Sequence, residues 1–483
     1  MTRRQALKYL AAAGGATAAA GLGYWLLTKS PAPAPPKTGT TSHSTSGATS
    51  GKYGEFLSWL ASVSKPYRGQ SQNISLELEL TPLGLQARDL DFFNSSGISN
   101  RYDLKPYALQ LQGLSLMTRT QSTAYDAFSV DYQDIGSFKD YILSPTQLAD
   151  MYRELTYDKI NPNDFWGVPW SYLATYPPAP FQGAGATGDT LFIPFDMSTM
   201  IQYYRSDLYS QMGLVPATTW NDYALNAKAF LSSKSVFGTV NEVAPDISSI
   251  FEFMNFLPSF GANLWDVHGG QITSGLSSSA ALAALETYLS LKPFSDPGSL
   301  TFTWSDVATN LLHGTGASAL QFNSYSPWMD DAARSRVVGK VGYSSNPTGP
   351  SGSFSTFAGN GLAVSKFSRH PETAWLWLQW ATSVGMQETL LLDAYHSFPS
   401  RKTVFGDSGV AVALQGDQYR ATRVTKQVWD DGRMATLLPF PKWASVLPSI
   451  ASSINNAWAG ANTPKDALDL ALGKIASWGT LTF

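Results

Sequence analysis

The chain has 483 residues, a formal net charge of −3 and no cysteine, and 14% of its residues are charged while 13% are aromatic. This length is enough for two or more domains, each with its own core. The charge balance gives no case for nucleic-acid binding, which calls for a basic patch, and the lack of cysteine excludes disulfides, thiolate zinc sites, iron–sulfur clusters and an acylated lipoprotein anchor.

The first residues predict an export signal. The run Thr2-Arg3-Arg4-Gln5-Ala6-Leu7-Lys8 resembles a twin-arginine signal and departs from it at Ala6, where phenylalanine is commoner. No charge follows from Tyr9 to Leu27, a stretch that is long for a signal and just enough to span a bilayer. Residues 1–28 are therefore interpreted as a signal peptide or a retained transmembrane helix. The lack of a small-x-small cleavage site favours the membrane anchor.

A linker follows this segment. Residues 29–52 are mostly proline, alanine, threonine, serine and glycine, which cannot bury enough apolar surface to fold. Export followed by a disordered linker predicts an extracellular domain at the cell surface, tethered to the cell membrane. Asn73 and Asn94 each begin an N-glycosylation sequon, which agrees with an outside location.

Strands and a helix alternate at the start of the folded region. The residue pattern predicts a strand from Ser75 to Leu80, a helix from Pro106 to Arg119 and a strand from Ala124 to Asp131. This order is typical of a βαβ unit in a mostly parallel sheet, whose ligands sit beyond the carboxyl ends of the strands. The candidate ligand contacts after the last strand, which would otherwise be a solvated loop or a helix cap, are Asp131, Tyr132 and Asp134.

Later elements are marked by caps and glycines. Thr219 and Asp222 form a capping box before one helix, and Pro371 suits the first position of another. Between them, Asn360 stands between Gly359 and Gly361, which permit close backbone approach. Asn360 is therefore a candidate ligand contact, and the alternative is a simple left-handed turn.

In order, these segments resemble the extracellular solute-binding proteins of ABC importers, in particular the carbohydrate-binding branch related to maltose-binding protein. Each motif alone is weakly to moderately specific, whereas the ordered series is specific and covers residues 53–483. The matching segments are Leu191–Asp196, Ile201–Leu208, Phe260–Asp266, Ala319–Trp328, Gly359–Lys366, Pro371–Trp377, Tyr395–Arg401, Leu438–Trp443 and Thr463–Leu468.

The resemblance implies an α/β fold of the periplasmic-binding-protein-like type II, with two lobes of mixed sheets joined by a multi-strand hinge. Lobe 1 would hold residues 53–195 and 361–410, and lobe 2 residues 196–360 and 411–483. It also implies a monomer without enzymatic activity, which closes its lobes over a mono- or oligosaccharide and presents it to the permease subunits of an ABC transporter.

Sugar recognition needs carboxylates and amides for hydroxyl groups and aromatic faces for C–H surfaces. The remaining candidates are polar residues at the first interlobe crossing and aromatic residues in turns or near helix starts, whose alternative role is a hinge cap or core packing. They are Asp196, Ser198, Trp265, Trp304, Tyr325, Trp328, Tyr395 and Trp443.

Other functions find less support in the sequence. The five histidines are scattered without an i, i+4 pair, so neither a metal site nor a cofactor is expected. Gly183 to Gly188 fits a dinucleotide fingerprint, but prolines precede it where a strand is required. A secreted glycoside hydrolase with a carboxylate pair remains the alternative function. A structural surface protein would show repeats, and none is found.

Overall fold

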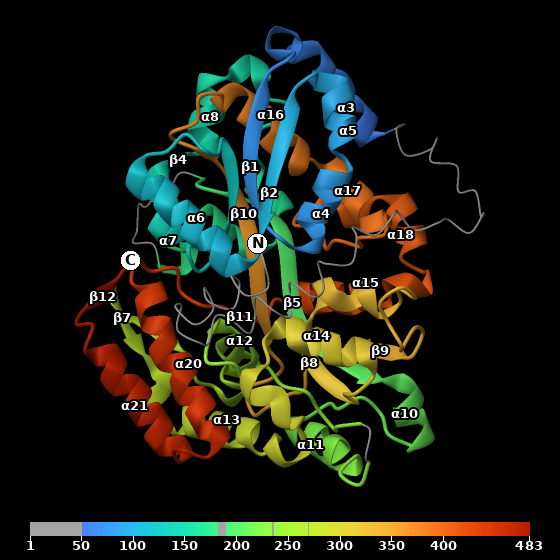
Figure 1. The fold of residues 1–483 in the computed structure, drawn as a ribbon, viewed down its shortest axis with the longest axis vertical. Helices are drawn as coiled ribbons and strands as arrows, with labels where there is room; N and C mark the ends of the chain where they lie inside the picture. The colour runs from blue at the N-terminus through green and yellow to red at the C-terminus, as the bar shows by residue number, and fades with distance from the viewer. Residues whose placement is uncertain (1–50, 182–189, 234–235, 269) are drawn as a thin grey trace, which may run out of the picture.

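The computed structural model describes residues 51–181, 190–233, 236–268 and 270–483. Figure 1 shows two lobes, one above the other, and so confirms the predicted two-lobed α/β fold. The signal or anchor at residues 1–28 and the linker up to residue 50 lie outside the described residues. Lys52, the last residue of the predicted linker, is the first residue of a helix. Within the described ranges, no helix has the length and apolar character needed to cross a membrane.

One mixed sheet extends through both lobes. Its strands follow the order β2-β1-β3-β10-β5-β8, and three short strands pair with its members: β4 and β11 with β10, and β9 with β5. A smaller sheet of β12, β7 and β6 lies in the lower lobe. The strands are β1 (Ser71–Glu77), β2 (Ser99–Lys105), β3 (Ala127–Asp131), β4 (Ile142–Leu143), β5 (Ile193–Arg205), β6 (Trp265–His268), β7 (Gln271–Ser274), β8 (Ser318–Phe322), β9 (Val341–Ser344), β10 (Ser355–Ser365), β11 (Met434–Ala435) and β12 (Leu481–Thr482).

Helices surround the strands of each lobe (Figure 1). The main helices of the upper lobe are α3 (Lys52–Val63), α4 (Leu80–Ala87), α5 (Asp89–Ser96), α6 (Tyr107–Thr120), α7 (Ile135–Phe138), α8 (Pro145–Met151), α16 (Pro371–Ala381), α17 (Val384–Leu392) and α18 (Ser408–Ala413). Those of the lower lobe and the crossing are α10 (Ser206–Gln211), α11 (Trp220–Ala229), α12 (Ile247–Phe256), α13 (Ser279–Leu289), α14 (Trp304–His313), α15 (Ser326–Met329), α19 (Arg420–Asp431), α20 (Trp443–Ala459) and α21 (Pro464–Ala476), and the short α9 (Gly167–Pro169) precedes β5.

The upper lobe contains the parallel strands that the sequence predicted. β1 is parallel to β2 and β3, and α6 connects those two neighbours. The predicted strand from Ser75 to Leu80 was wrong at its end, because β1 stops at Glu77 and α4 begins at Leu80. Pro82 fits the first turn of α4 but has no N–H for a strand ladder. The chain therefore turns sharply, and this turn carries two glutamates.

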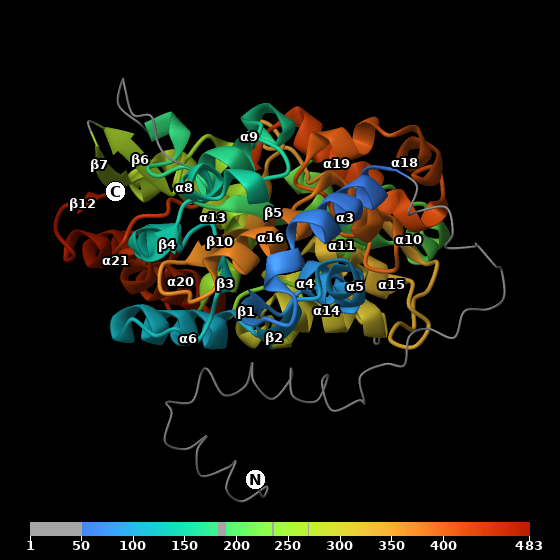
Figure 2. The ribbon, with the colours of Figure 1, turned by 90° about the horizontal axis from the view of Figure 1, so that it is seen from above.

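The buried helix α16 organises the upper lobe. Figure 2, seen from above, shows it in the middle, with α3, α4 and α5 on one side and α6, α8 and β4 on the other. Its three tryptophans, Trp375, Trp377 and Trp380, are at most 1% exposed. These tryptophans are therefore core residues, and the helix start that the sequence predicted at Pro371 is confirmed.

β5 and β10 are the long strands that cross between the lobes (Figure 1). They pair antiparallel from Phe357 to Leu362 of β10, with a register shift after Asn360. A Cβ on Gly361 would lie 2.6 Å from Cβ of Phe192, and one on Gly359 would lie 2.8 Å from the carbonyl oxygen of Asp196. The two glycines are therefore needed for the close approach of the segments at the crossing.

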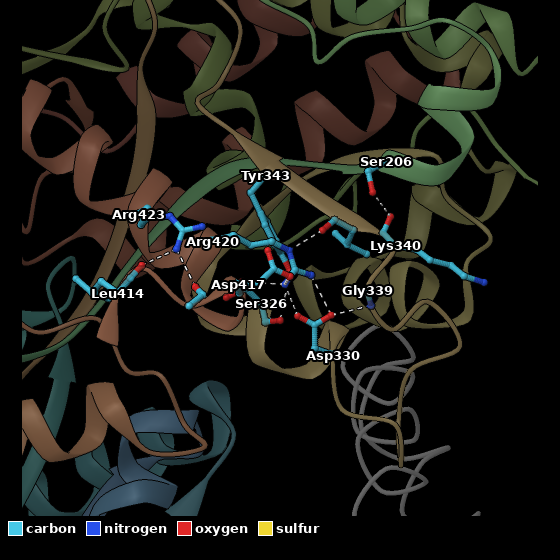
Figure 3. A network of polar contacts seen from close by, with 12 residues as sticks. Ser206, Ser326, Asp330, Gly339, Lys340, Tyr343, Leu414, Asp417, Arg420 and Arg423 are labelled. Atoms are coloured by element: carbon cyan, nitrogen blue, oxygen red, sulfur yellow. Dashed lines mark hydrogen bonds and ion pairs between the residues drawn. The ribbon is translucent and has the colours of Figure 1, made fainter. Parts of the chain in front are cut away.

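A third connection runs through α18 and α19. Tyr419 donates its hydroxyl to the Leu392 carbonyl of the upper lobe at 3.1 Å. The next residue, Arg420, is held by the lower lobe: it donates to the Val341 carbonyl at 3.0 Å and to Asp330 at 2.9 Å, and it lies over the Tyr343 ring (Figure 3). Adjacent residues thus contact opposite lobes.

The Gly361→Ala variant should lose about 1–3 kcal/mol of unfolding free energy, because its new methyl group cannot move away from Phe192 without shifting the crossing strand. Gly473→Ala is the control, since a Cβ there meets nothing within 4 Å and alanine favours the interior of α21. Chemical denaturation of both variants measures the effect. Equal stability of the two would contradict the tight packing at the crossing.

Candidate ligand-binding site

A cavity lies where β5 and β10 cross, and both lobes contribute to its wall. The space between its walls, including the part that is open to solvent, is about 520 Å³. Its lining residues are Glu77, Glu79, Tyr107, Asp131, Gln133, Asp196, Ser198, Ile247, Phe251, Trp304, Phe322, Ser324, Tyr325, Ala358, Gly359 and Asn360.

Three adjacent strands place polar side chains in one row of this wall. Asn360 of β10 is paired with Asp131 of β3 on one side and with Asp196 of β5 on the other. Directly paired residues point to the same face of a sheet, so the amide stands between two carboxyls. Its Nδ2 donates to Glu77 Oε2 at 3.3 Å, and Thr81 donates its hydroxyl to Asp196 at 2.7 Å.

Burial makes the carboxyls of the upper wall hard to ionise. It raises the pKa of Glu77 and the pKa of Asp196 each to about 6. Burial, and then the charge of Glu77, hold the pKa values of Asp131 and Glu79 well above their usual range. The upper wall therefore carries four carboxyls that resist full ionisation at neutral pH.

The lower lobe contributes aromatic faces. Trp304 is the first residue of α14, whose start is fixed by a capping box between Thr303 and Asp306. The Trp304 carbonyl accepts a hydrogen bond from Gln321 Nε2 of β8 at 2.8 Å, which ties the helix start to the sheet. Tyr325 is 6% exposed and ends the short turn Asn323–Tyr325 that follows β8. Trp304 and Tyr325 line the same cavity as the carboxyl row.

Hydroxyl groups complete the lower wall. Ser198 of β5 donates to Asn323 Oδ1 at 3.3 Å and lies equally close to the Ser324 hydroxyl. Asn323 in turn accepts from the backbone N–H of Thr199 at 2.7 Å, so the turn after β8 is held against the crossing strand. The site thus combines acids, amides, hydroxyls and aromatic rings on rigid elements.

Six of the sequence-predicted candidates line the cavity: Asp131, Asp196, Ser198, Trp304, Tyr325 and Asn360. Two others lie just behind its wall. Asp134 is buried and accepts a hydrogen bond from the Tyr107 hydroxyl at 2.8 Å. Trp328 packs its ring 5.1 Å from that of Tyr325 and carries the Arg334 guanidinium on its face. Both therefore support lining residues rather than forming the wall.

The structure does not bring the remaining four candidates to the cavity. Tyr132 is buried and its hydroxyl accepts from the Leu437 N–H at 2.9 Å. Trp265 and Trp443 are 7% and 1% exposed and pack against one another and Phe440 in the lower core. Tyr395 lies against Gly84 of α4. Apolar packing accounts for the position of each ring.

Sequence reasoning missed several lining residues. Glu77 ends β1, as Asp131 ends β3, and Glu79 follows two residues later, so the rule that singled out Asp131 could have found both glutamates. They were missed because the predicted strand extended through them to Leu80. Phe251 and Ile247 of the fully buried α12 carry no signal in the sequence. Among the described residues, no cluster of three or more histidine or acidic side chains could hold a metal ion.

A family model for the bacterial extracellular solute-binding proteins matches residues 112–388 of this chain, more than half of its length. The chain belongs to this family. The resemblance drawn from its sequence motifs is thereby confirmed.

Sequence relatives agree with this family. A "Probable amino-acid ABC transporter periplasmic-binding protein" of Sinorhizobium fredii is 23% identical over 86% of this chain and 91% of its own length. A "Probable ABC transporter-binding protein" of Deinococcus radiodurans is 24% identical over 64% of this chain and 74% of its own length.

Solved structures share the fold. A solute-binding protein of Agrobacterium radiobacter in complex with ribitol has a TM-score of 0.73 at 21% identity, covering 86% of this chain and all of that one. A maltose-bound protein of T. maritima has a TM-score of 0.72 at 18% identity, covering 85% of this chain and all of that one.

The buried carboxyls make the unfolding free energy depend on pH. A raised pKa means that the folded state binds the proton more tightly than the unfolded state, so the stabilisation is complete below pH 4 and lost as pH rises through about 6. We expect the free energy of unfolding to fall between pH 4.5 and 7.5. Asp196→Asn should remove on the order of 2–3 kcal/mol of that fall, since its amide oxygen still accepts from Thr81. Denaturant titrations at both pH values test this, and a rise in stability over that interval would contradict it.

Proposed function

We propose that this protein is the substrate-binding component of an ABC importer, and that it binds a sugar or related polyol in the cavity between its lobes and delivers it to the permease. The observation that carries this proposal is the lining of the cavity: the row of Asp131, Asn360 and Asp196 lines the same cavity as the aromatic residues Trp304 and Tyr325. Carboxylates and amides bind hydroxyl groups, and aromatic faces cover the C–H surface of a sugar ring.

The polar groups also favour a polyol over a free amino acid. An amino acid carries a carboxylate, which binding sites usually pair with arginine, lysine or a helix N-terminus. No basic side chain is among the described residues that line the cavity, and four carboxyls are. The proteins of similar fold that were solved with ribitol, D-mannitol and alpha-D-tagatose agree with this choice.

The two lobes would close on the ligand by bending at the crossing strands and at residues 419 and 420, which contact opposite lobes. Closure would present a surface made of both lobes to the permease. The N-terminal segment would tether the protein, as a monomer, to the outside of the cell membrane. Asn94, an exposed residue of α5, is accessible for glycosylation, whereas Asn73 lies half-buried in β1.

A glycoside hydrolase is the second candidate function. Asp131 and Asp196 lie on either side of Asn360, and their raised pKa values would suit a general acid. The family to which the chain belongs consists of binding proteins, which supports binding without bond cleavage.

At least one compound in a panel of sugars and polyols should raise the melting temperature of the protein. A ligand at 100 times its Kd adds roughly 2.7 kcal/mol to the free energy of unfolding. Trp304→Ala should weaken binding of the active compound by about tenfold or more, since the stacking face is lost. Trp478→Ala is the matched control, because this tryptophan is exposed and does not line the cavity. Equal affinity of both variants would place the ligand elsewhere.

Bound sugar should be recovered intact. After long incubation at pH 5 and 7, chromatography should show the starting sugar alone, because the binding function needs no bond cleavage. Release of shorter sugars that stops in Asp131→Asn, but persists in a variant of the exposed Asp469, would instead establish the hydrolase.

A further inference from the structure

The carboxyls that line the cavity have no positively charged side chain beside them among the described residues of its wall. Glu77, Glu79, Asp131 and Asp196 line it, and none of the described lining residues is basic. The groups that influence these carboxyls are other carboxyls and neutral hydrogen-bond donors: Asp134 adds a fifth acid behind the wall, and Thr81 and Asn360 donate. Glu77, Asp134 and Asp196 are buried, and Glu79 and Asp131 are half-buried. Carboxylates withdrawn from water without a cation are costly unless protons or a ligand neutralise them.

Two buried amide oxygens also lack partners. Asn360 is 4% exposed and Gln133 is 1% exposed, both line the cavity, and neither Asn360 Oδ1 nor Gln133 Oε1 receives a hydrogen bond. The orientation of the Asn360 amide is fixed, because its Nδ2 donates to the acceptor Glu77 Oε2. The cavity therefore offers unused acceptors, independently of its charge, which a ligand that brings donors would satisfy.

The chemistry of these groups limits the class of ligand further. The carboxyls do not converge as metal ligands do, since the described residues contain no group of three that could hold an ion. Trp304 and Tyr325 present aromatic rings, which attract an organic cation as well as a C–H surface. An ammonium group brings three hydrogen-bond donors and a positive charge. It could therefore neutralise the carboxyls, donate to the unpartnered amide oxygens and interact favourably with the aromatic rings.

We propose that the ligand is a polyhydroxylated amine, such as an amino sugar, whose ammonium group sits among Glu77, Glu79, Asp131 and Asp196. This rests on the proposed function and names its substrate class. The hydroxyl groups of the ligand contact Ser198 and the amides, as they would in a neutral sugar. The ammonium group replaces the protons that the buried carboxyls otherwise hold.

Proton release is a consequence that a neutral sugar does not share. The acids Glu77, Glu79, Asp131, Asp134 and Asp196 are the groups at the cavity that lose protons as pH rises. Two phenols, Tyr107 and Tyr325, also line the cavity, and burial raises the pKa of Tyr107 well above its usual range, so that this phenol stays neutral. An ammonium ligand favours their ionised forms, so its affinity rises from pH 5 to pH 7.5 and its binding releases protons. The affinity of a neutral sugar does not rise over this interval.

Matched pairs of ligands test the proposal. The probes are glucosamine oligomers against their N-acetylated counterparts, and 1-amino-1-deoxyglucitol against glucitol, by calorimetry in buffers of different ionisation enthalpy. We expect at least one amine to bind at least about tenfold more tightly than its neutral partner at pH 7.5, with net proton release.

Variants at one carboxyl provide the second measurement. Glu79→Gln should weaken binding of the amine by about tenfold more than it weakens binding of the neutral partner, and should raise the melting temperature of the free protein at pH 7.5, because it removes a carboxyl that lies close to other carboxyls. Glu286→Gln, on the exposed side of α13, should change neither quantity. The rise in melting temperature also shows that Glu79→Gln is folded.

The outcomes separate this proposal from the one on which it rests. If the neutral member of each pair binds as tightly as the amine, and no protons are released, the proposal of an amine ligand is wrong while the sugar-binding function stands. A panel in which neither member of any pair binds would count against the sugar-binding function itself.

Discussion

The pairing of β5 with β10 is the constraint on which the rest of this structure depends. These strands carry the chain between the lobes and at the same point set Asn360 beside Asp196, so the connection and the polar wall of the cavity share one backbone register. The shift after Asn360 and the glycines on either side of it allow this close approach. A change at the crossing therefore acts on the fold and on the site together, because a one-residue slip would turn every side chain to the other face.

The acidic wall shows a conflict between stability and function. Most buried charges in proteins have a partner of opposite charge, as Arg401 has in Asp164, whereas no basic side chain among the described residues lines the cavity beside Glu77, Asp131 and Asp196. The surrounding strands hold these acids in place despite their repulsion. If the proposed donor-rich ligand binds there, it would relieve this repulsion, and part of the binding free energy would come from the protein itself.

The aromatic residues explain why composition was a weak guide to the site. Trp304 and Tyr325 line the cavity, while Trp265 and Trp443 stand in similar sequence contexts and fill the lower core. A turn or a helix start indicates that a ring can face a cleft. Whether it does so depends on which neighbouring elements cover it, and for Trp443 these are Trp265 and Phe440.

The sequence by itself determined the two-lobed fold class, the family, the helix caps at Thr219 and Pro371, and the crossing glycines around Asn360, because these depend on local backbone requirements and on the order of motifs. It also indicated six of the lining residues, through their positions near strand ends, crossings and helix starts. Only the tertiary structure decided that Glu77 and Glu79 join Asp131 and Asp196 without a basic partner. Residues from β1, β3 and β5 meet there through strand pairing between distant positions, from Ile74 with Ala127 to Asp131 with Asn360, and no local pattern records the charge of a neighbour that distant.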